Sequence, residues 1–156
     1  MQAEGAMTGT LSLEPPDRAR LVIDATVLDV RDGLRDLMAC PVVQDLSPDC
    51  LGTTELVLAE ALNNVVEHAY ARFPGQIEVE LRRGTDQLHF HIADKGLPMP
   101  GAEPPQGRLP EVGAFDDLPE GGFGWFLIRS LAQDLRYRRE GERNMLSFDV
   151  PVDNAA

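Results

Sequence analysis

Residues 77–92 read IEVELRRGTDQLHFHI, two runs of alternating apolar and polar side chains joined by a short polar stretch that begins at Gly84. Successive side chains of a β-strand point to opposite faces of a sheet. The pattern therefore predicts a β-hairpin with one buried face and one solvated face. His89 and His91 fall on the polar side of the second run, where we expect them to face solvent rather than to bind a metal, because no third ligand has a suitable spacing.

One strand and one helix are expected upstream of this hairpin. Residues 19–24, ARLVID, have the apolar character of a strand. Thr26, with Asp29 three residues later, resembles the start of a capped helix. Apolar positions recur at helical spacing after Thr26 and stop near Pro41, so we expect the first helix to end there.

A second helix is expected to start at Ser47 and Pro48 and to run to about Arg72. Ser47 offers a capping oxygen, and a proline costs little in the first turn of a helix because its missing N–H would be unpaired there anyway. Apolar residues of this segment fall on one arc, and Glu60 and Asn64 fall on the opposite arc. One face of the helix is therefore expected to pack and the other to carry carboxylates and an amide.

A long loop separates the hairpin from a third helix. Residues 95–120 hold six of the 12 prolines and four glycines with little apolar periodicity, which is typical of a lid or a binding loop. Residues 121–131 predict an apolar helix, and residues 135–150 predict a second hairpin. This order of elements predicts an α+β fold with two layers, in which three helices cover one face of a mixed, mainly antiparallel sheet.

Length and charge limit the classes of protein that fit. The chain has 156 residues, of which 43% are hydrophobic, enough for one domain; we place it at residues 19–151, between a flexible N-terminal arm at residues 1–18 and a tail at residues 152–156. The formal net charge is -12, which argues against binding to nucleic acid or to an anionic membrane. No apolar run approaches the roughly 18 residues of a membrane span, and the start lacks the basic segment of a secretory signal. We therefore expect a cytoplasmic protein.

Three polar clusters interrupt the regular pattern and are candidates for chemistry. Glu60 and Asn64, one helical turn apart, could place a general base beside an oxygen ligand for a cation such as Mg²⁺. Asp94 could accept a hydrogen bond from the exocyclic amine of a base, with Gly96 allowing a flat ring to approach. The glycine-rich residues 121–124 open a helix, where backbone N–H groups and the helix dipole favour phosphate.

Each cluster alone also has a purely structural interpretation. The clusters would then be a solvated helix face, an Asp-x-Gly turn and a sharp entry into a helix. Taken together they supply the metal ligand, the amine reader and the phosphate cradle that a Mg-ATP site needs. Lys95 is the only lysine, which excludes a P-loop because that motif ends in Gly-Lys-Ser/Thr.

The three clusters resemble, in this order, the motifs of the gyrase, Hsp90, histidine-kinase and MutL ATPase superfamily. Residues 60–70, EALNNVVEHAY, resemble the N-box; residues 94–98, DKGLP, resemble the first glycine box; and residues 121–129, GGFGWFLIR, resemble the second glycine box. The His-Ala-Tyr ending and the Phe-Leu-Ile-Arg run are most similar to the anti-sigma-factor serine kinases of bacterial sporulation and stress switches. The resemblance covers about residues 19–151 and implies a Bergerat-type ATP-binding fold with its lid at about residues 95–120.

This resemblance implies a role for each matching residue. Asn64 would ligate the Mg²⁺ that bridges the ATP phosphates, Glu60 would act as the base toward the attacking hydroxyl, and Asp94 would read the adenine amine. Gly96 would leave room for the base, and Pro98 follows it in the same cofactor-binding motif. The remaining cofactor contacts would come from the second glycine box, at Gly121, Gly122, Phe123 and Gly124.

The resemblance also implies an activity and partners. Members of that family use ATP to phosphorylate a serine on an anti-anti-sigma protein of the STAS fold, and the same kinase, usually a homodimer, sequesters a sigma factor. The leading hypothesis is therefore an ATP-dependent serine/threonine-protein kinase that acts as an anti-sigma, partner-switching factor. Two alternatives stay open: a non-catalytic ATP-binding module that holds other proteins, and the ATPase domain of a split histidine kinase. The last is disfavoured because the stretch before residue 19 is too short for a dimerising helical hairpin.

A basic stretch lies near the end of the chain. Arg129, Arg136, Arg138 and Arg139 are expected to form a solvated face, with docking of an acidic partner as the alternative. Trp125 is expected to belong to the core.

Overall fold

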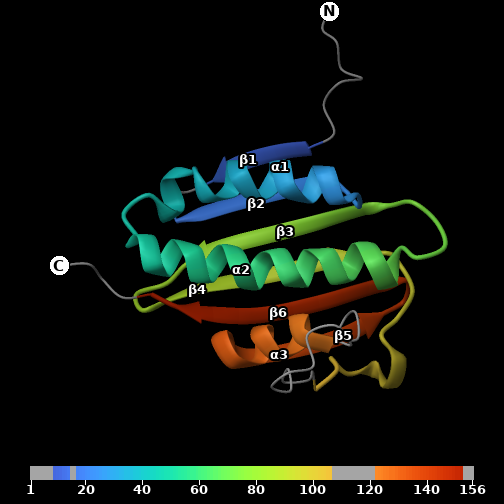
Figure 1. Cartoon of the computed structure of the whole chain (residues 1–156). Helices are drawn as coiled ribbons and strands as arrows, with labels where there is room; N and C mark the ends of the chain where they lie inside the picture. The colour runs from blue at the N-terminus through green and yellow to red at the C-terminus, as the bar shows by residue number, and fades with distance from the viewer. Residues whose placement is uncertain (1–8, 15–16, 107–121, 153–156) are drawn as a thin grey trace, which may run out of the picture.

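The computed structural model describes residues 9–14, 17–106 and 122–152. Three helices cover one face of a six-stranded sheet, with α1 and α2 side by side and α3 over the β5–β6 end (Figure 1). The elements in chain order are β1 (Gly9–Glu14), β2 (Arg18–Asp24), α1 (Val27–Met38), α2 (Pro48–Asn64), β3 (Gln76–Arg83), β4 (Gln87–Asp94), α3 (Gly122–Leu131), β5 (Gln133–Glu140) and β6 (Arg143–Pro151).

The strand order is β1-β2-β3-β4-β6-β5. Every pairing among the described strands is antiparallel, so the expected α+β architecture is confirmed but the sheet is not mixed. The predicted hairpin is β3 and β4, and the second predicted hairpin is β5 and β6. Strands that are connected through helices also run antiparallel to the strands beside them, so the described strands include no parallel pair.

The flexible arm expected at residues 1–18 is wrong for residues 9–14, which form β1, and for Arg18, which begins β2. β1 pairs with β2 from Gly9 opposite Ile23 to Glu14 opposite Arg18. Thr10 and Ser12 are exposed, whereas Leu11 packs against the core. A short edge strand with so few apolar residues gives a weak period-2 signal. Residues 1–8 and 15–16 lie outside the described residues, as do residues 153–156 of the expected tail.

Both predicted helix starts are confirmed by their caps. The Thr26 hydroxyl accepts a hydrogen bond from the backbone N–H of Asp29 at 3.0 Å. The Ser47 hydroxyl accepts one from the N–H of Cys50 at 3.1 Å, and Pro48 occupies the first turn. Each cap pairs a backbone donor that the helix itself leaves without a partner.

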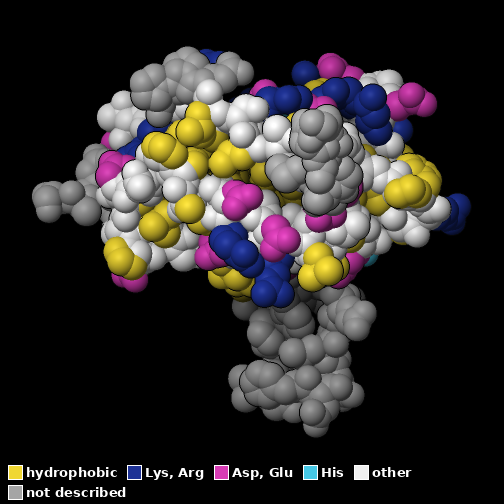
Figure 2. Space-filling view, turned by 90° about the horizontal axis from the view of Figure 1, so that it is seen from above, with side chains coloured by type: hydrophobic (Ala, Val, Ile, Leu, Met, Phe, Trp, Pro, Cys, Tyr) yellow, Lys and Arg dark blue, Asp and Glu magenta, His cyan; other side chains and the backbone are white. Residues whose placement is uncertain are grey.

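The core lies between the helices and the inner face of the sheet. Inward residues of β2, β3, β4 and β6 are buried, and outward residues of the same strands are polar or charged. Exposed large hydrophobic side chains in the described residues are scattered among charged ones, as the view from the β1 side illustrates (Figure 2). The largest fully buried side chains are Leu21, Ile23, Leu37, Leu58, Leu62, Ile77, Leu81, Leu88, Phe90, Ile92, Ile128 and Phe148.

The second helix ends differently from the prediction. Regular α-helix stops at Asn64, and a single π-helical turn, Val65–Ala69, replaces the expected extension to Arg72. A π-turn inserts an extra residue per turn and often occurs at functional sites. Here it places Tyr70 and the carbonyl of Ala69 against the segment that follows β4.

Two glycines test how tightly the helices pack. Gly52 of α2 has open space around it, so Gly52→Ala should raise the free energy of unfolding by roughly 0.5–1 kcal/mol, because alanine restricts the unfolded chain and favours the helix. The same change at Gly33 of α1 should lower it, since an added Cβ would lie 2.9 Å from Ile23 Cγ2 and 3.0 Å from Leu21 Cδ2. Urea unfolding of both variants measures this. Equal stabilisation at both positions would contradict the close packing of α1 on β2.

Candidate functional site

A hollow of about 420 Å³ opens between α2, α3 and the segment that follows β4. We call it the helix-side hollow. It brings together three residues that the sequence singled out, Asn64, Asp94 and Pro98, although they lie on different elements. Its other walls include Trp125 of α3 and Leu146 of β6.

Glu60 and Gly124 meet beside Asn64, which lines this hollow, although neither of the two is part of the lining. A Cβ built on Gly124 would lie 2.7 Å from Glu60 Oε2 and 3.5 Å from Asn64 Nδ2, so a larger residue there would displace the Glu60 carboxylate. Gly124 is in the first turn of α3, and the Glu60 carboxylate therefore lies at the positive end of that helix dipole. The second glycine box thus approaches the two polar residues of α2 directly.

Asn64 is buried, with 8% of its surface exposed, so the alternative interpretation as a solvated helix face does not hold for it. α3 packs against α2 and covers this face, which a helical periodicity in α2 alone does not reveal. The Asn64 Nδ2 atom is buried without a hydrogen-bond partner among the described residues. A buried amide nitrogen without a hydrogen-bond partner lowers the stability of the fold. Rotation about the Cβ–Cγ bond of Asn64 would present either the amide nitrogen or the amide oxygen to a ligand.

Metal binding at this end would depend on a ligand that brings its own oxygens. Among the described residues there is no group of three or more His, Cys, Asp or Glu side chains that could hold an ion. The Asn64 carboxamide fits a Mg²⁺ ion that is bound chiefly by phosphate oxygens and water, because Mg²⁺ commonly takes only one or two protein ligands.

Asp94 ends β4 at the other end of the hollow. Its Oδ1 atom accepts hydrogen bonds from the backbone N–H of Gly96 at 2.8 Å and from Asn144 Nδ2 at 2.7 Å. Burial raises the pKa of Asp94 above its ordinary value of 3.8, and these hydrogen bonds and the charge of Arg139 oppose the shift only in part. The second oxygen, Oδ2, accepts no hydrogen bond from the residues that the structure describes, so it remains available to a donor in the hollow.

A buried polar network that the sequence analysis missed holds Asp94 in place. Asn144 also donates to the carbonyl of Leu97 at 2.9 Å, and its own oxygen accepts from the Tyr137 hydroxyl and from Arg139 Nη1 at 3.0 Å. Asp94 and Arg139 both lie directly opposite Asn144, on β4 and β5 respectively. A signal was present, because Asn144 occupies an inward position of a strand whose other inward residues are apolar.

Arg139 does not belong to a solvated basic face. Its Nη1 atom also donates to the carbonyl of Gly96 at 2.7 Å, which fixes the turn after Asp94. Arg136 and Arg138 are exposed, as expected. Trp125 is buried at 3% exposure, which confirms its place in the core, and it also lines the helix-side hollow.

Gly96 is needed because two backbone segments touch. A Cβ there would overlap the carbonyl group of Ala69, and the N–H of the next residue, Leu97, donates to that carbonyl at 2.7 Å. The N–H of Lys95 donates to the Tyr70 hydroxyl at 2.8 Å. Gly96 is not part of the hollow's lining. Close packing against Ala69 explains why a glycine is needed at position 96, and the idea that it leaves room for an adenine ring stays a prediction.

The first part of the expected lid is held by side chains of α3 and β5. Arg129 donates to the carbonyls of Pro104 and Pro105 at 2.7 and 2.8 Å, and the N–H of Met99 donates to the Tyr137 hydroxyl at 3.0 Å. Arg129 is therefore exposed but not merely solvated. Residues 107–120 of the lid and Gly121 lie outside the described residues, and Gly122 and Phe123 are described only as the start of α3.

None of the helices in the described part of the chain combines the length and the apolar character that a bilayer crossing requires.

The charge on Asp94 should destabilise the fold. Asp94→Asn keeps an oxygen that can accept from Gly96 and Asn144 but removes the buried charge, so the free energy of unfolding should rise at neutral pH. When folding raises the pKa of a carboxyl group, the free energy of unfolding of the protein falls as the pH rises through that pKa. The gain should therefore shrink as the pH falls below the raised pKa of Asp94, where the native carboxyl is protonated. Urea unfolding between pH 4 and 7.5 measures it.

Asp86→Asn, in the exposed turn between β3 and β4, is the matched control. It should change the unfolding free energy little at any of these pH values. A loss of stability for Asp94→Asn at neutral pH, or a gain that does not vary with pH, would contradict the assignment.

Comparison with known proteins agrees with this geometry. The chain matches the histidine kinase-like ATPase domain over residues 23–150. It is 35% identical over 100 residues to the serine/threonine-protein kinase BtrW of Bordetella bronchiseptica, which covers 62% of this chain and 67% of that protein. It is 29% identical over 94 residues to the serine-protein kinases RsbW of Bacillus mycoides and Bacillus cereus, so it spans little more than half, 56%, of their length. Because the domain match covers most of the sequence, the chain belongs to the histidine kinase-like ATPase family.

Proposed function

We propose that this chain is an ATP-dependent serine/threonine-protein kinase that acts as an anti-sigma, partner-switching factor. The observation that carries the proposal is that Asn64 and Asp94 line one hollow and that Glu60 and Gly124 meet beside Asn64. This is the arrangement that the resemblance to the serine kinases implies. The names of the BtrW and RsbW relatives support the same reaction class.

The Asp94 end suits an adenine ring. Oδ2 of Asp94 would accept a hydrogen bond from the exocyclic amine, because Oδ1 is already occupied by Gly96 and Asn144. Apolar side chains dominate the walls around it and would cover the faces of the ring; they include Val65, Leu97 and Met99. Asn144 would act as a positioning residue, since its Nδ2 atom donates to Asp94 Oδ1.

The Asn64 end suits the phosphates. The first turn of α3 presents backbone N–H groups there, and the contact with Gly124 brings that turn to Glu60 and Asn64. Asn64 would hold a Mg²⁺ ion, which when bound neutralises phosphate charge. Contacts of ATP with Pro98, Gly121, Gly122 and Phe123 complete the proposal.

Glu60 would serve as the base. The hydroxyl oxygen of the partner's serine attacks the γ-phosphorus, a new O–P bond forms, and the bond to the β,γ-bridging oxygen breaks. ADP leaves with that electron pair, and the serine proton passes to the Glu60 carboxylate. Most of the rate enhancement would come from positioning and charge neutralisation, with little covalent chemistry for the protein to perform.

The partners follow from the resemblance. The phosphorylated protein would be an anti-anti-sigma protein of the STAS fold, and the unphosphorylated kinase, as a cytoplasmic homodimer, would bind a sigma factor or an equivalent regulated protein. The second candidate is a binding module that uses ATP without transferring its phosphate. The half-buried Glu60 beside the α3 turn favours the kinase, because a module has no need of a base there.

Glu60→Gln should abolish phosphoryl transfer and leave ATP affinity nearly unchanged. The amide keeps the size and the contact with Gly124 but cannot take the serine proton, and loss of a general base costs roughly 10²–10⁴-fold in rate. Incubation with γ-labelled ATP and candidate STAS proteins measures transfer, and the fluorescence of Trp125, the only tryptophan, measures ATP binding.

Glu55→Gln, an exposed glutamate on the same helix, is the control and should transfer phosphate normally. Normal transfer by Glu60→Gln would remove Glu60 from the mechanism. Stable ATP-dependent complexes with a STAS protein, but no label transfer by the native chain, would favour the binding module.

Asn64→Ala should remove the dependence of ATP affinity on magnesium. In the native chain Mg²⁺ should tighten ATP binding, and losing its only proposed protein ligand should cost about tenfold or more in affinity when Mg²⁺ is present. Titration of ATP with Mg²⁺ or with EDTA, followed by Trp125 fluorescence, measures this. Asn63→Ala tests the neighbouring amide, which lies outside the hollow's lining, and should keep the magnesium effect. An equal effect of Mg²⁺ on Asn64→Ala and on the native chain would contradict the assignment.

A further inference from the structure

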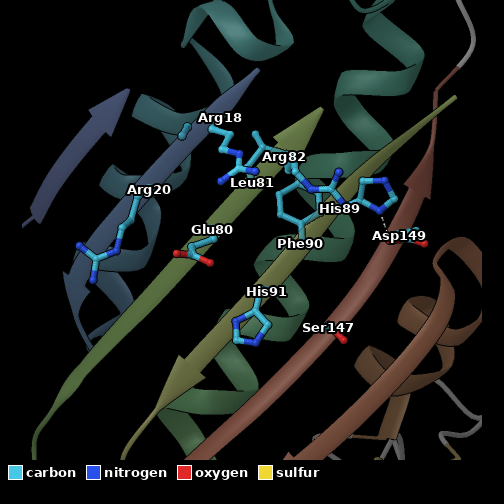
Figure 3. A pocket seen from close by; sticks show the side chains of 11 residues that line it. Arg18, Arg20, Glu80, Leu81, Arg82, His89, Phe90, His91, Ser147 and Asp149 are labelled. Carbon is cyan, nitrogen blue, oxygen red and sulfur yellow. Dashed lines mark hydrogen bonds and ion pairs between the residues drawn. The ribbon is translucent and has the colours of Figure 1, made fainter. Parts of the chain in front are cut away.

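A second hollow, of about 350 Å³, lies on the face of the sheet that carries no helices. We call it the outer-face hollow. Figure 3 shows its polar side chains projecting from β2, β3, β4 and β6 with the helices behind the sheet. The polar and charged residues that line it are Arg18, Arg20, Glu80, Arg82, His89, His91, Ser147 and Asp149.

Two arginines line this hollow without contacting an acidic side chain that the structure describes. Arg18 and Arg82 lie directly opposite each other on β2 and β3, and both are exposed. Among the side chains that the structure describes, which do not include that of Glu14 opposite Arg18, neither guanidinium has a hydrogen-bond or ion-pair partner. Like charges placed directly opposite on a sheet repel each other, so Arg18 and Arg82 do not stabilise the fold through each other.

Glu14 lies opposite Arg18 on β1 in the same row, and the other neighbouring charges are engaged or lie in another row. Arg20 forms an ion pair with Glu78 at 2.7 Å, and Asp149 is bound to His89 Nδ1 at 2.6 Å. Glu80 lies opposite Arg20, one row along the sheet from the arginine pair. Arg18 and Arg82 therefore form a cationic pair, with Glu14 on its β1 side, in a chain whose formal net charge is -12.

We propose that Arg18 and Arg82 form a binding site for a phosphate monoester on the outer face of the sheet. Two guanidinium groups present several N–H donors to a tetrahedral oxyanion, and their two positive charges match a phosphate monoester dianion better than a single carboxylate. The ligand is a phosphorylated side chain of a protein or a free phosphate ester. The inference does not rest on the proposed kinase activity, because the helix-side hollow opens on the opposite face.

The three histidines provide a site-resolved test. His89 and His91 line the outer-face hollow, whereas His68 lines the helix-side hollow. Inorganic phosphate, phosphoserine peptide, the same peptide without phosphate, and acetate would be titrated at fixed pH into chain labelled for imidazole NMR. Phosphate and phosphopeptide should move the His89 and His91 signals in a saturable manner. Acetate and the unmodified peptide should not.

Paired substitutions assign the effect to the two arginines. Arg18→Gln with Arg82→Gln should weaken phosphate binding at least about tenfold, as loss of charge-assisted hydrogen bonds predicts. The control is Arg136→Gln with Arg138→Gln, which removes the same charge from the same sheet face, where these arginines pair with Asp134 and Glu140. It should change the affinity less than about twofold, given the weakness of exposed ion pairs.

Each outcome decides the proposal. Tighter binding of the phosphopeptide than of phosphate identifies a phosphorylated protein as the ligand, and equal binding identifies a free phosphate ester; both support the site. The proposal would be overturned if only the His68 signal moved, or if both double variants lost the same affinity. It would also be overturned if acetate bound as tightly as phosphate, or if the shifts did not saturate as the phosphate concentration was raised. Unchanged thermal unfolding of both variants excludes misfolding as the cause.

Discussion

The contact between Gly96 and the carbonyl of Ala69 determines where the two ends of the helix-side hollow lie relative to each other. The π-turn Val65–Ala69 brings that carbonyl to the segment after β4, and Leu97 donates to it. Asp94 is two residues from this contact, and Asn64 is one turn before it in α2. Any larger side chain at position 96 must separate α2 from β4, so the spacing of the two polar ends depends on the absence of one Cβ.

The buried carboxylate of Asp94 shows how recognition and stability oppose each other in this fold. Burial raises its pKa, while Asn144, Gly96 and Arg139 offset part of the cost. An asparagine would satisfy the same two protein donors without the charge. Aspartate is better than asparagine only in having a second oxygen that can accept a hydrogen bond from the exocyclic amine of a base. The amide nitrogen of an asparagine would stand in that place, and two hydrogen-bond donors would then face each other. The proposed ligand therefore supplies the reason for a residue that folding alone disfavours.

Local periodicity predicted the elements well but not what covers them. The β3–β4 hairpin, the caps at Thr26 and Ser47 and the layer order were predictable because each depends on neighbours in sequence. The arc that holds Asn64 was correctly separated from the apolar arc, yet α3 buries it, and no pattern within α2 encodes that contact. The Asn144 network was missed for the same reason, since it depends on the register that places Asn144 beside Asp94. The convergence of Asn64 and Asp94 was anticipated only by combining three distant motifs.

The two hollows lie on opposite faces of the sheet and also near opposite ends of β3. Ile77, opposite Asp94, and Arg82, opposite Arg18, lie at opposite ends of this strand. Five residues of strand span roughly 17 Å, which exceeds the Debye length of about 8 Å at physiological ionic strength. A charge bound at the outer face would therefore have little direct effect on a phosphate group in the helix-side hollow. Coupling between the sites would require a shift in the pairing of β3 with its neighbours, and the fixed register makes that costly because a one-residue slip exchanges the buried and solvated faces.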